Sequence, residues 1–346
     1  MLVVDGATGG SVTSVGGVTV GNSDTGEMTI RKGGVVTVAG GAGTVTLASN
    51  AGSTGTLNIG TSGGGTTAGT LNAGVVNGGA GTAVINFNQT NSTTFAPQIT
   101  GSIAVKQLGT GTTILTATNT YAGTTDVTAG ALVVNGALTG GAVVTVDSGA
   151  TLAGTGAIAP ALNQSIFING TLNVGDPTVA VTASVLGLTT SGAGSMVMGA
   201  GSFIQVNLLA GAGLGDNSGT STAADILNLH GQMNATAGGT LVIGNPNLMS
   251  AFAGGDQWKV LELNSAGPNA GSVTGTLAVN DSSLALATGL YGSFNQTTGI
   301  YSILDLRPQL SAANSGLPIA MANIQALIAG GQTVLNDINS ELGDKG

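Results

Sequence analysis

The phrase Gly170-Thr-Leu-Asn-Val174 decides the fold, because close variants of it recur along the chain. The variants are Gly55-Thr-Leu-Asn-Ile59, Gly69-Thr-Leu-Asn-Ala73, Gly130-Ala-Leu-Val-Val134, Gly239-Thr-Leu-Val-Ile243 and Gly275-Thr-Leu-Ala-Val279. Each phrase opens with a glycine suited to a tight turn and continues with residues suited to a strand. In Leu-Asn-Val the aliphatic side chains fall on one face and the polar one on the other, as in a half-buried strand. The sequence therefore predicts a succession of turns and short strands.

Two all-β architectures fit such a succession, a sandwich of antiparallel hairpins and a solenoid of parallel coils. Asn-Gly pairs at 77–78, 135–136 and 169–170 are typical of two-residue hairpins as well as of solenoid corners. Three features favour the solenoid: the expected strands are short, they outnumber the seven or so of a sandwich, and large aromatic core residues are scarce. With ~20 residues per coil, ~300 residues would form about 15 coils in a rod of roughly 70 Å.

The composition supports a thin repetitive fold and excludes several functional classes. The 346 residues include 62 glycines, with 6% charged and 3% aromatic residues, which is unlike a compact enzyme. Disorder is disfavoured because β-branched residues are plentiful and charge is scarce. The net charge is −9 and the six basic residues are scattered, which excludes a surface that tracks nucleic-acid phosphates. Cysteine is absent, so disulfides and thiolate sites are excluded.

The N-terminus, Met1-Leu-Val-Val-Asp5, has neither the basic region nor the long apolar region of a signal peptide. If the protein is secreted, we expect this chain to be a fragment. No apolar run approaches the ~20 residues that a membrane-spanning helix needs.

Three segments are expected: repeat-rich coils over 1–178, a denser capping region over 179–308, and a linker with a helix over 309–346. The middle segment contains Phe252, Trp258, Tyr291, Phe294 and Tyr301, and aromatic side chains dominate core burial. The last segment spaces its apolar residues alternately by four and three, which predicts an amphipathic α-helix with one apolar face. That face comprises Leu317, Met321, Ile324, Ile328, Gly331, Leu335, Ile338 and Leu342.

The run from Gly111 to Leu138, GTTILTATNTYAGTTDVTAGALVVNGAL, resembles the passenger-associated repeat of bacterial autotransporter passenger domains. The stretches from Gly69 to Gln89 and from Gly26 to Val36 resemble the coil that precedes this repeat and a related surface-protein repeat. The likeness is strong over about 55–175 and looser over 180–308.

The resemblance implies a right-handed parallel β-helix at the cell surface or secreted, exported by type V secretion. It also implies a partner, a C-terminal outer-membrane β-barrel translocator, with an α-helix threading its pore. The apolar face over 317–342 lies where that helix would be, whereas neither a barrel nor a signal peptide is recognisable in this sequence.

No catalytic, cofactor-binding or metal site is predicted. Polysaccharide-degrading β-helices need clustered carboxylates. Asp126, Asp147 and Asp176 are 21 and 29 residues apart and are expected at solvated corners. His230 is the sole histidine and is expected to face outward from a strand, which leaves Ser-His-Asp catalysis and histidine-rich metal sites without support.

Three further motifs are interpreted as structural. Gly254-Gly-Asp-Gln-Trp258 matches too little of the calcium-binding nonapeptide, and Gly63-Gly-Gly65 lacks the lysine and helix of a phosphate loop. The threonines from Thr112 to Thr120 suggest a hydroxyl array that meets ice or a crystalline polysaccharide, but the Thr-x-Thr ladder is not sustained over many coils.

Two functional classes remain. The favoured one is a non-catalytic structural or adhesive passenger whose uncharged β surface contacts a host or neighbouring cell. The rival is a passenger enzyme acting on polysaccharides, which would require a groove with at least two carboxylates and an aromatic side chain. Self-association through open coil ends or flat β faces is a third class, because unprotected strand edges are adhesive.

Overall fold

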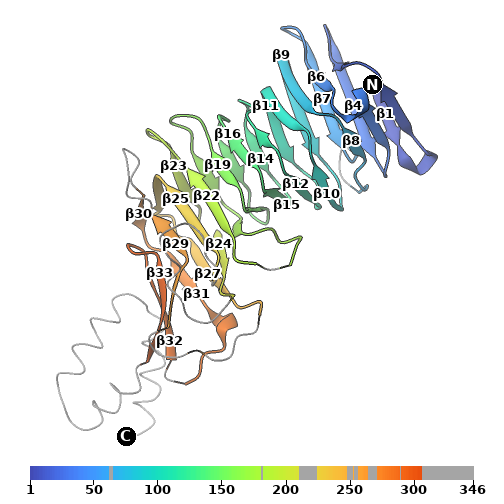
Figure 1. The fold of residues 1–346 in the computed structure, drawn as a ribbon. Coiled ribbons are helices and arrows are strands. Elements are labelled where there is room, and N and C mark those ends of the chain that lie inside the picture. The colour runs from blue at the N-terminus through green and yellow to red at the C-terminus, as the bar shows by residue number, and fades with distance from the viewer. Residues whose placement is uncertain are drawn as a thin grey trace, which may run out of the picture.

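The computed structural model shows an elongated, gently curved stack of strands, with the N-terminal coil at one end (Figure 1). It describes residues 1–61, 65–180, 182–209, 224–247, 252, 256–263, 271–288 and 290–305. The helix expected over 317–342 lies outside these residues. In the part of the chain that is described, no helix is long and apolar enough to cross a membrane.

The main sheet has 13 strands and runs the length of the stack (Figure 1). Its path is β1 (Leu2–Asp5), β4 (Thr25–Arg31), β7 (Thr54–Ile59), β9 (Val75–Phe87), β11 (Gln98–Gln107), β14 (Thr125–Val127), β17 (Val144–Val146), β20 (Ile166–Ile168), β23 (Ser195–Met198), β26 (Gln232–Ala235) and β30 (Ser272–Gly275), with β3 (Val18–Val20) and β6 (Thr44–Leu47) as a side branch. Every pairing in it is parallel, as in β4 with β7 and β17 with β20. These pairings exclude the antiparallel sandwich.

Two further parallel sheets complete the coils. The second sheet has eight strands: β10 (Ser92–Phe95), β12 (Thr112–Leu115), β15 (Ala131–Val134), β18 (Thr151–Gly154), β21 (Thr171–Val174), β24 (Phe203–Asn207), β27 (Thr240–Gly244) and β31 (Ala278–Asn280). The third sheet has six: β13 (Thr118–Asn119), β16 (Ala137–Thr139), β19 (Ala157–Ala159), β22 (Val185–Thr189), β25 (Ile226–His230) and β29 (Leu261–Leu263). The chain visits the three sheets in turn, which is the topology of a β-helix.

The recurrent sequence phrases do form strands, but they fall on different sheets. The phrases at Gly130, Gly170 and Gly239 lead into second-sheet strands, and the one at Gly55 lies in the main sheet. The phrase at Gly69 leads into β8 (Thr70–Asn72), which belongs to a separate three-stranded sheet. Residues 275–279 instead turn a corner, because Gly275 ends β30 and β31 begins at Ala278. The phrase therefore predicts a turn and a strand but not which face of the coil the strand occupies.

Coil length is near the expected 20 residues only in the middle of the stack. There Thr112 pairs with Ala131, and Thr151 pairs with both Ala131 and Thr171. Beyond this region Thr171 pairs with Phe203, and Phe203 with Thr240, so each coil contains more than 30 residues. The estimate of about 15 coils was therefore wrong. Among the described residues the main path has 11 strands, from β1 to β30, and long connections separate the strands at both ends.

Aliphatic side chains fill the coil interior in columns that follow the register. One column, on the second sheet, consists of Leu132, Leu152, Leu172, Ile204 and Leu241, all at most 2% exposed. Burying each such side chain contributes about 1.5–3 kcal/mol. Leu, Ile and Val supply most of the filling, and three aromatic side chains of the parallel coils, Phe87, Phe95 and Tyr121, are buried with them.

The N-terminal coils have a different cross-section. An N-terminal sheet of three parallel strands contains β2 (Ser11–Ser14), β5 (Val35–Val38) and β8 (Thr70–Asn72). Strand β9 pairs through Val75–Gly78 with β6 and through Thr82–Phe87 with β7. Both branches of the main sheet thus merge at β9. Short 3-10 turns are η1 (Gly6–Thr8), η2 (Ala39–Gly41) and η3 (Ser282–Leu284).

The parallel pattern ends in an antiparallel C-terminal sheet, which the sequence did not predict. Strands β28 (Gln257–Lys259) and β32 (Leu290–Asn295) both pair with β33 (Ile300–Asp305). Within this sheet Trp258 is 1% exposed and Tyr301 is 0% exposed, with ring centroids 6.4 Å apart. The aromatic residues of this segment therefore form a small core, whereas the division into three domains stays a prediction.

Candidate functional site

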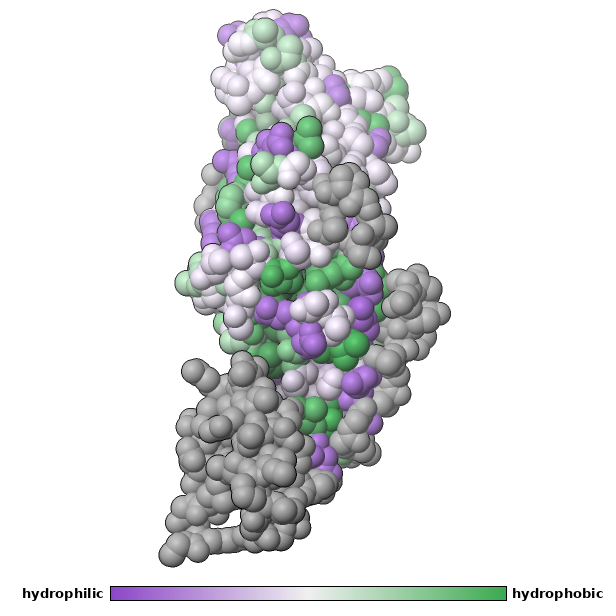
Figure 2. Space-filling model, turned by 90° about the vertical axis from the view of Figure 1, so that its left-hand side faces the viewer, coloured by the Kyte–Doolittle hydropathy of each residue, from purple (hydrophilic) through white to green (hydrophobic). Residues whose placement is uncertain are grey.

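The outer face of the main sheet carries a column of partly exposed side chains, one from each of six successive strands from β9 to β23. In register, the column consists of Asn86, Lys106, Asp126, Thr145, Phe167 and Val197. Neighbouring strands are about 4.8 Å apart, so the column is a regular array of amide, charged, hydroxyl and apolar groups. Figure 2 shows a face on which near-neutral residues predominate, with small hydrophilic and hydrophobic groups interspersed. We call these six residues the main-sheet column.

The structure places the candidate residues Asp126, Asp147 and His230 on different elements. Asp126 lies within β14 and not at a corner, and Thr124 donates a hydrogen bond of 3.2 Å to its Oδ2. Asp147 follows β17 at a corner of the next coil. His230 ends β25, where it is paired with Thr189 and partly exposed. Asp126, Asp147 and His230 line neither the pocket beside Tyr121 nor the pocket beside Asp225.

One pocket does bring two carboxylates together, namely those of Asp176 and Asp225. It lies where β21, β24 and the start of β25 meet the loop that follows β21, and its wall includes Asn173, Asn207 and Ser184. Asp176 is one of the acids expected from the sequence at a solvated corner, whereas Asp225, 49 positions away, is not among the predicted candidates. The available signal was an acidic residue directly before the alternating strand Ile226–His230.

Asp225 is 1% exposed and its carboxylate joins three segments of the chain. Its Oδ1 accepts a hydrogen bond from the backbone N–H of Ser184 at 3.0 Å. Its Oδ2 accepts from the backbone N–H of Asn207 at 3.0 Å and from Asn207 Nδ2 at 2.8 Å. Burial raises the pKa of Asp225 to about 6, although the hydrogen bonds from Asn207 and Ser184 oppose the rise.

The pKa of Asp176 is shifted in the opposite direction. Partial burial would raise its pKa, but hydrogen bonds from Thr178 and Asn135 outweigh burial and bring the pKa below its ordinary value. Thr178 donates to Oδ1 through both its backbone N–H and its hydroxyl, and Asn135 Nδ2 donates to Oδ2. The contact with Asn135 ties the loop after β21 to the corner after β15, two coils earlier.

The pocket has part of what glycan hydrolysis needs. Two carboxylates with oppositely shifted pKa values can in principle divide the roles of acid and base. However, no aromatic side chain lines the pocket within the described residues, and the hydrogen bonds to Asp225 come from the protein itself. In the described ranges no group of three or more His, Cys, Asp or Glu residues could hold a metal ion.

Of the threonines from Thr112 to Thr120, Thr113 points into the stack, whereas Thr116, Thr118 and Thr120 are exposed. Thr113 is 0% exposed and its hydroxyl donates to Gln107 Oε1 at 2.6 Å and accepts from Gln89 Nε2 at 2.7 Å. Gln89 and Gln107 are also 0% exposed, so the three side chains form a polar link between coils inside the stack. The alternation of apolar and polar residues predicted strands correctly here, but it could not identify a threonine that points inward.

Two comparisons bear on identity. Residues 106–134 match the family model described as passenger-associated-transport-repeat. The adhesin BmaC autotransporter of Brucella suis biovar 1 (strain 1330) is 43% identical to this chain over 99 residues. That alignment covers 28% of the chain and 3% of the Brucella protein. The matched repeat extends from β11 into β15, across one full coil of the solenoid.

Proposed function

We propose that this chain, which is part of an autotransporter passenger domain and is therefore exposed at the cell surface or secreted, is a non-catalytic β-helical stalk with an adhesive surface. The observation that carries the proposal is the parallel ladder from β1 to β30, whose strands from β9 to β23 present the main-sheet column at a constant spacing. Such a rod holds a binding surface away from the membrane and keeps it rigid.

The main-sheet column is the surface that we assign to adhesion. Its single exposed aromatic residue, Phe167, is 36% exposed and is flanked in register by Thr145 and Val197. Aromatic residues commonly dominate the energy of protein contacts, whereas neighbouring polar groups supply complementarity. The name of the Brucella relative, an adhesin, is consistent with this assignment. The ligand is proposed to be a host or neighbouring-cell surface component.

Export follows from the same proposal. The family resemblance implies a translocator β-barrel in the same polypeptide, and the right-handed winding and the helix over 317–342 belong to this proposal. A stack in which each coil contacts only its neighbours can fold coil by coil as it emerges from a pore.

Binding of the purified chain to a panel of host and bacterial cells, measured by flow cytometry, tests the adhesive role. Phe167→Ala should reduce binding at least about fivefold, because it removes the aromatic contact. Leu162→Ala is the matched control, since Leu162 is 65% exposed and lies outside the column. Binding that is absent from the wild type, or equally reduced by both variants, would contradict the assignment.

A glycan-cleaving passenger is the alternative, and the pocket of Asp176 and Asp225 is the observation that favours it. The test is release of reducing ends from a panel of polysaccharides, with Asp176→Asn and Asp225→Asn as variants. Turnover by the wild type that both variants abolish would establish the enzyme, whereas no turnover at any pH between about 4 and 8 would exclude it.

A further inference from the structure

We propose that the pocket of Asp176 and Asp225 binds the side-chain ammonium group of a lysine that belongs to a partner protein. The pocket is built on second-sheet strands and the loop after β21, away from the main-sheet column, so the proposal is independent of adhesion through Phe167. Its volume is about 370 Å³, near the lower end of the ~300–1,000 Å³ that is typical of ligand sites. A space of this size accommodates a single side chain.

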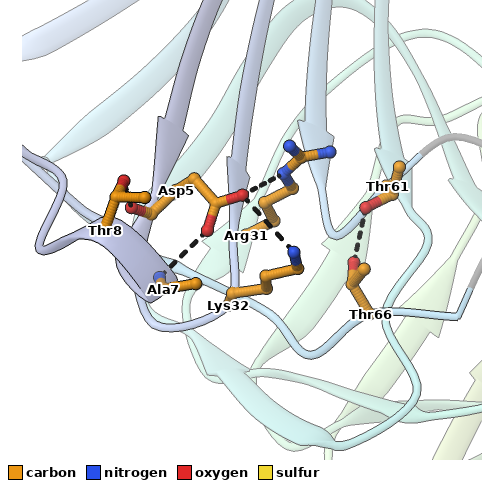
Figure 3. Close-up of polar contacts among 7 residues, drawn as sticks. All are labelled: Asp5, Ala7, Thr8, Arg31, Lys32, Thr61 and Thr66. Atoms are coloured by element: carbon orange, nitrogen blue, oxygen red, sulfur yellow. Dashed lines mark hydrogen bonds and ion pairs between the residues drawn. The ribbon is translucent and has the colours of Figure 1, made fainter.

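The two carboxylates of the pocket have no basic partner. Among the described residues that line it there is no lysine, arginine or histidine, and neither acid forms an ion pair with another described residue. Asp5 shows the contrast, because its Oδ2 lies 2.8 Å from Arg31 Nε and 3.6 Å from Lys32 Nζ (Figure 3). Two acids gathered in one pocket without a cation favour a positively charged ligand.

Three oxygen atoms of the pocket residues can still accept hydrogen bonds. Asp225 Oδ2 and Asp176 Oδ1 each accept two hydrogen bonds, whereas Asp225 Oδ1 and Asp176 Oδ2 each accept one and keep a free lone pair. The third oxygen is Asn173 Oδ1, which is buried and has no hydrogen-bond partner. A buried acceptor without a donor is destabilising, so this oxygen points independently to a ligand that donates.

The number and kind of these acceptors select an ammonium group. Lysine presents three N–H donors on a compact head and has no acceptor, which matches three separate oxygens. Arginine fits less well because its planar fork pairs with both oxygens of one carboxylate, and in each acid one oxygen already accepts two hydrogen bonds. Calcium takes about six to eight oxygen ligands, more than the free acceptors found here.

The rim of the pocket favours a lysine carried by a protein over a free amine. Pro177, Val179 and Ala180 line the pocket and are exposed, and the exposed fraction of Val179 is 59%. The aliphatic stem of a lysine packs against such groups while its charged head reaches the carboxylates. A partner chain on either side of that lysine would also cover the apolar rim, which a small amine would leave exposed.

The ionisation of Asp225 should make this binding depend on pH. Burial raises the pKa of Asp225 to about 6, whereas hydrogen bonds hold the pKa of Asp176 below its ordinary value. These two are the titratable groups among the described residues that line the pocket. Asp225 therefore gains its charge as the pH rises through 6, while Asp176 and the lysine stay charged. The affinity for an ammonium group should increase over the same range.

Titration of the isotope-labelled chain with the peptide acetyl-Gly-Lys-Gly-amide, followed by NMR, tests the proposal. The readouts are the backbone amide signals of Ser184 and Asn207, which donate to Asp225. We expect saturable shifts with a dissociation constant of about 1–5 mM at about pH 7.5, and binding at least about fivefold weaker at about pH 5. The same peptide with an acetylated lysine should cause no shift, because acetylation removes the charge.

Three variants separate the site from general attraction between opposite charges. Asp176→Asn and Asp225→Asn should each weaken binding at least about tenfold, and Asp176 is the safer position because it is partly exposed. Asp147→Asn is the matched control, since it removes the same charge at a corner outside the pocket and should change the dissociation constant less than about twofold. The proposal is overturned by absence of shifts at about pH 7.5, by equal weakening in Asp147→Asn, or by tighter binding of butylamine or calcium chloride than of the peptide.

Discussion

Replacing Asp225 with asparagine should change how the stability of the protein depends on pH. The carboxyl group is buried, and its pKa rises from an ordinary value of 3.8 to about 6 in the folded chain. The folded state therefore binds the proton more tightly than the unfolded state does between these two values. The contribution of proton binding at Asp225 to the free energy of unfolding is fully present below pH 3.8 and is lost as the pH rises through 6. Asparagine has the same shape but does not titrate.

The size of the effect follows from the two pKa values. A rise from 3.8 to about 6 corresponds to about 3 kcal/mol of free energy of unfolding. Relative to Asp225→Asn, the wild type should therefore lose up to about 3 kcal/mol between pH 4 and pH 7. Asp5 and Asp176 have lowered pKa values, so their contributions to the free energy of unfolding increase with pH, at lower pH values. These contributions are the same in both proteins and cancel when the free energy of unfolding of one is subtracted from that of the other.

Urea denaturation at several pH values measures this difference. Trp258 is the sole tryptophan and is 1% exposed, so its fluorescence reports unfolding of the C-terminal coils. Asp225 belongs to the same region, because β25 begins at the next residue and pairs with β29, which follows Trp258. A loss of 3 kcal/mol would lower the urea midpoint by about 1–3 M. The reasoning would be refuted if the stability of the wild type relative to Asp225→Asn stayed constant with pH or increased as the pH rises. Either result would show that the three N–H donors balance or outweigh burial.

Three smaller changes test the coil interior by urea denaturation. Leu152→Ala should cost about 2–5 kcal/mol, because the side chain is 0% exposed within its aliphatic column, whereas Thr151→Ala on the outer face should cost less than about 1. Gly154→Ala should destabilise by more than about 3 kcal/mol, because φ is +138° and a Cβ would collide with the carbonyl of the preceding coil. Gly149→Ala, at φ +83° in open space, should cost only about 1 kcal/mol. Tyr121→Phe removes a buried 2.7 Å hydrogen bond and should cost about 1 kcal/mol. Equal effects of Leu152→Ala and Thr151→Ala, or of the two glycine changes, would contradict the assigned faces.

The parallel solenoid could be predicted from the sequence because its signals are local. Alternation in Leu172-Asn173-Val174 determines which side chains enter the core, and glycines such as Gly170 mark the corners. The predicted coil length of ~20 residues was correct only where no long connection lies between successive strands. Nothing in the strand phrases reports how many residues separate one coil from the next.

The features that escaped prediction depend on distant residues. Asp176 and Asp225 meet because the coils place them side by side, which spacing along the chain does not show. The antiparallel pairing of Trp258 with Tyr301 looks in sequence like another alternating pair of strands. Thr113 faces inward because Gln89 and Gln107 supply hydrogen-bond partners there.

Cysteine cross-linking tests most directly the claim that neighbouring coils are parallel and in register. In the main sheet Val84 is paired with Ala104, and Asn86 with Lys106, on the outer face of β9 and β11. Their Cα atoms are about 4.8 Å apart across the ladder, within the range of a disulfide. The pair Val84→Cys with Ala104→Cys should oxidise readily, whereas Val84→Cys with Lys106→Cys should not. An antiparallel pairing with Ile85 opposite Val105 would reverse this result, and failure of the first pair to oxidise would likewise contradict the parallel register.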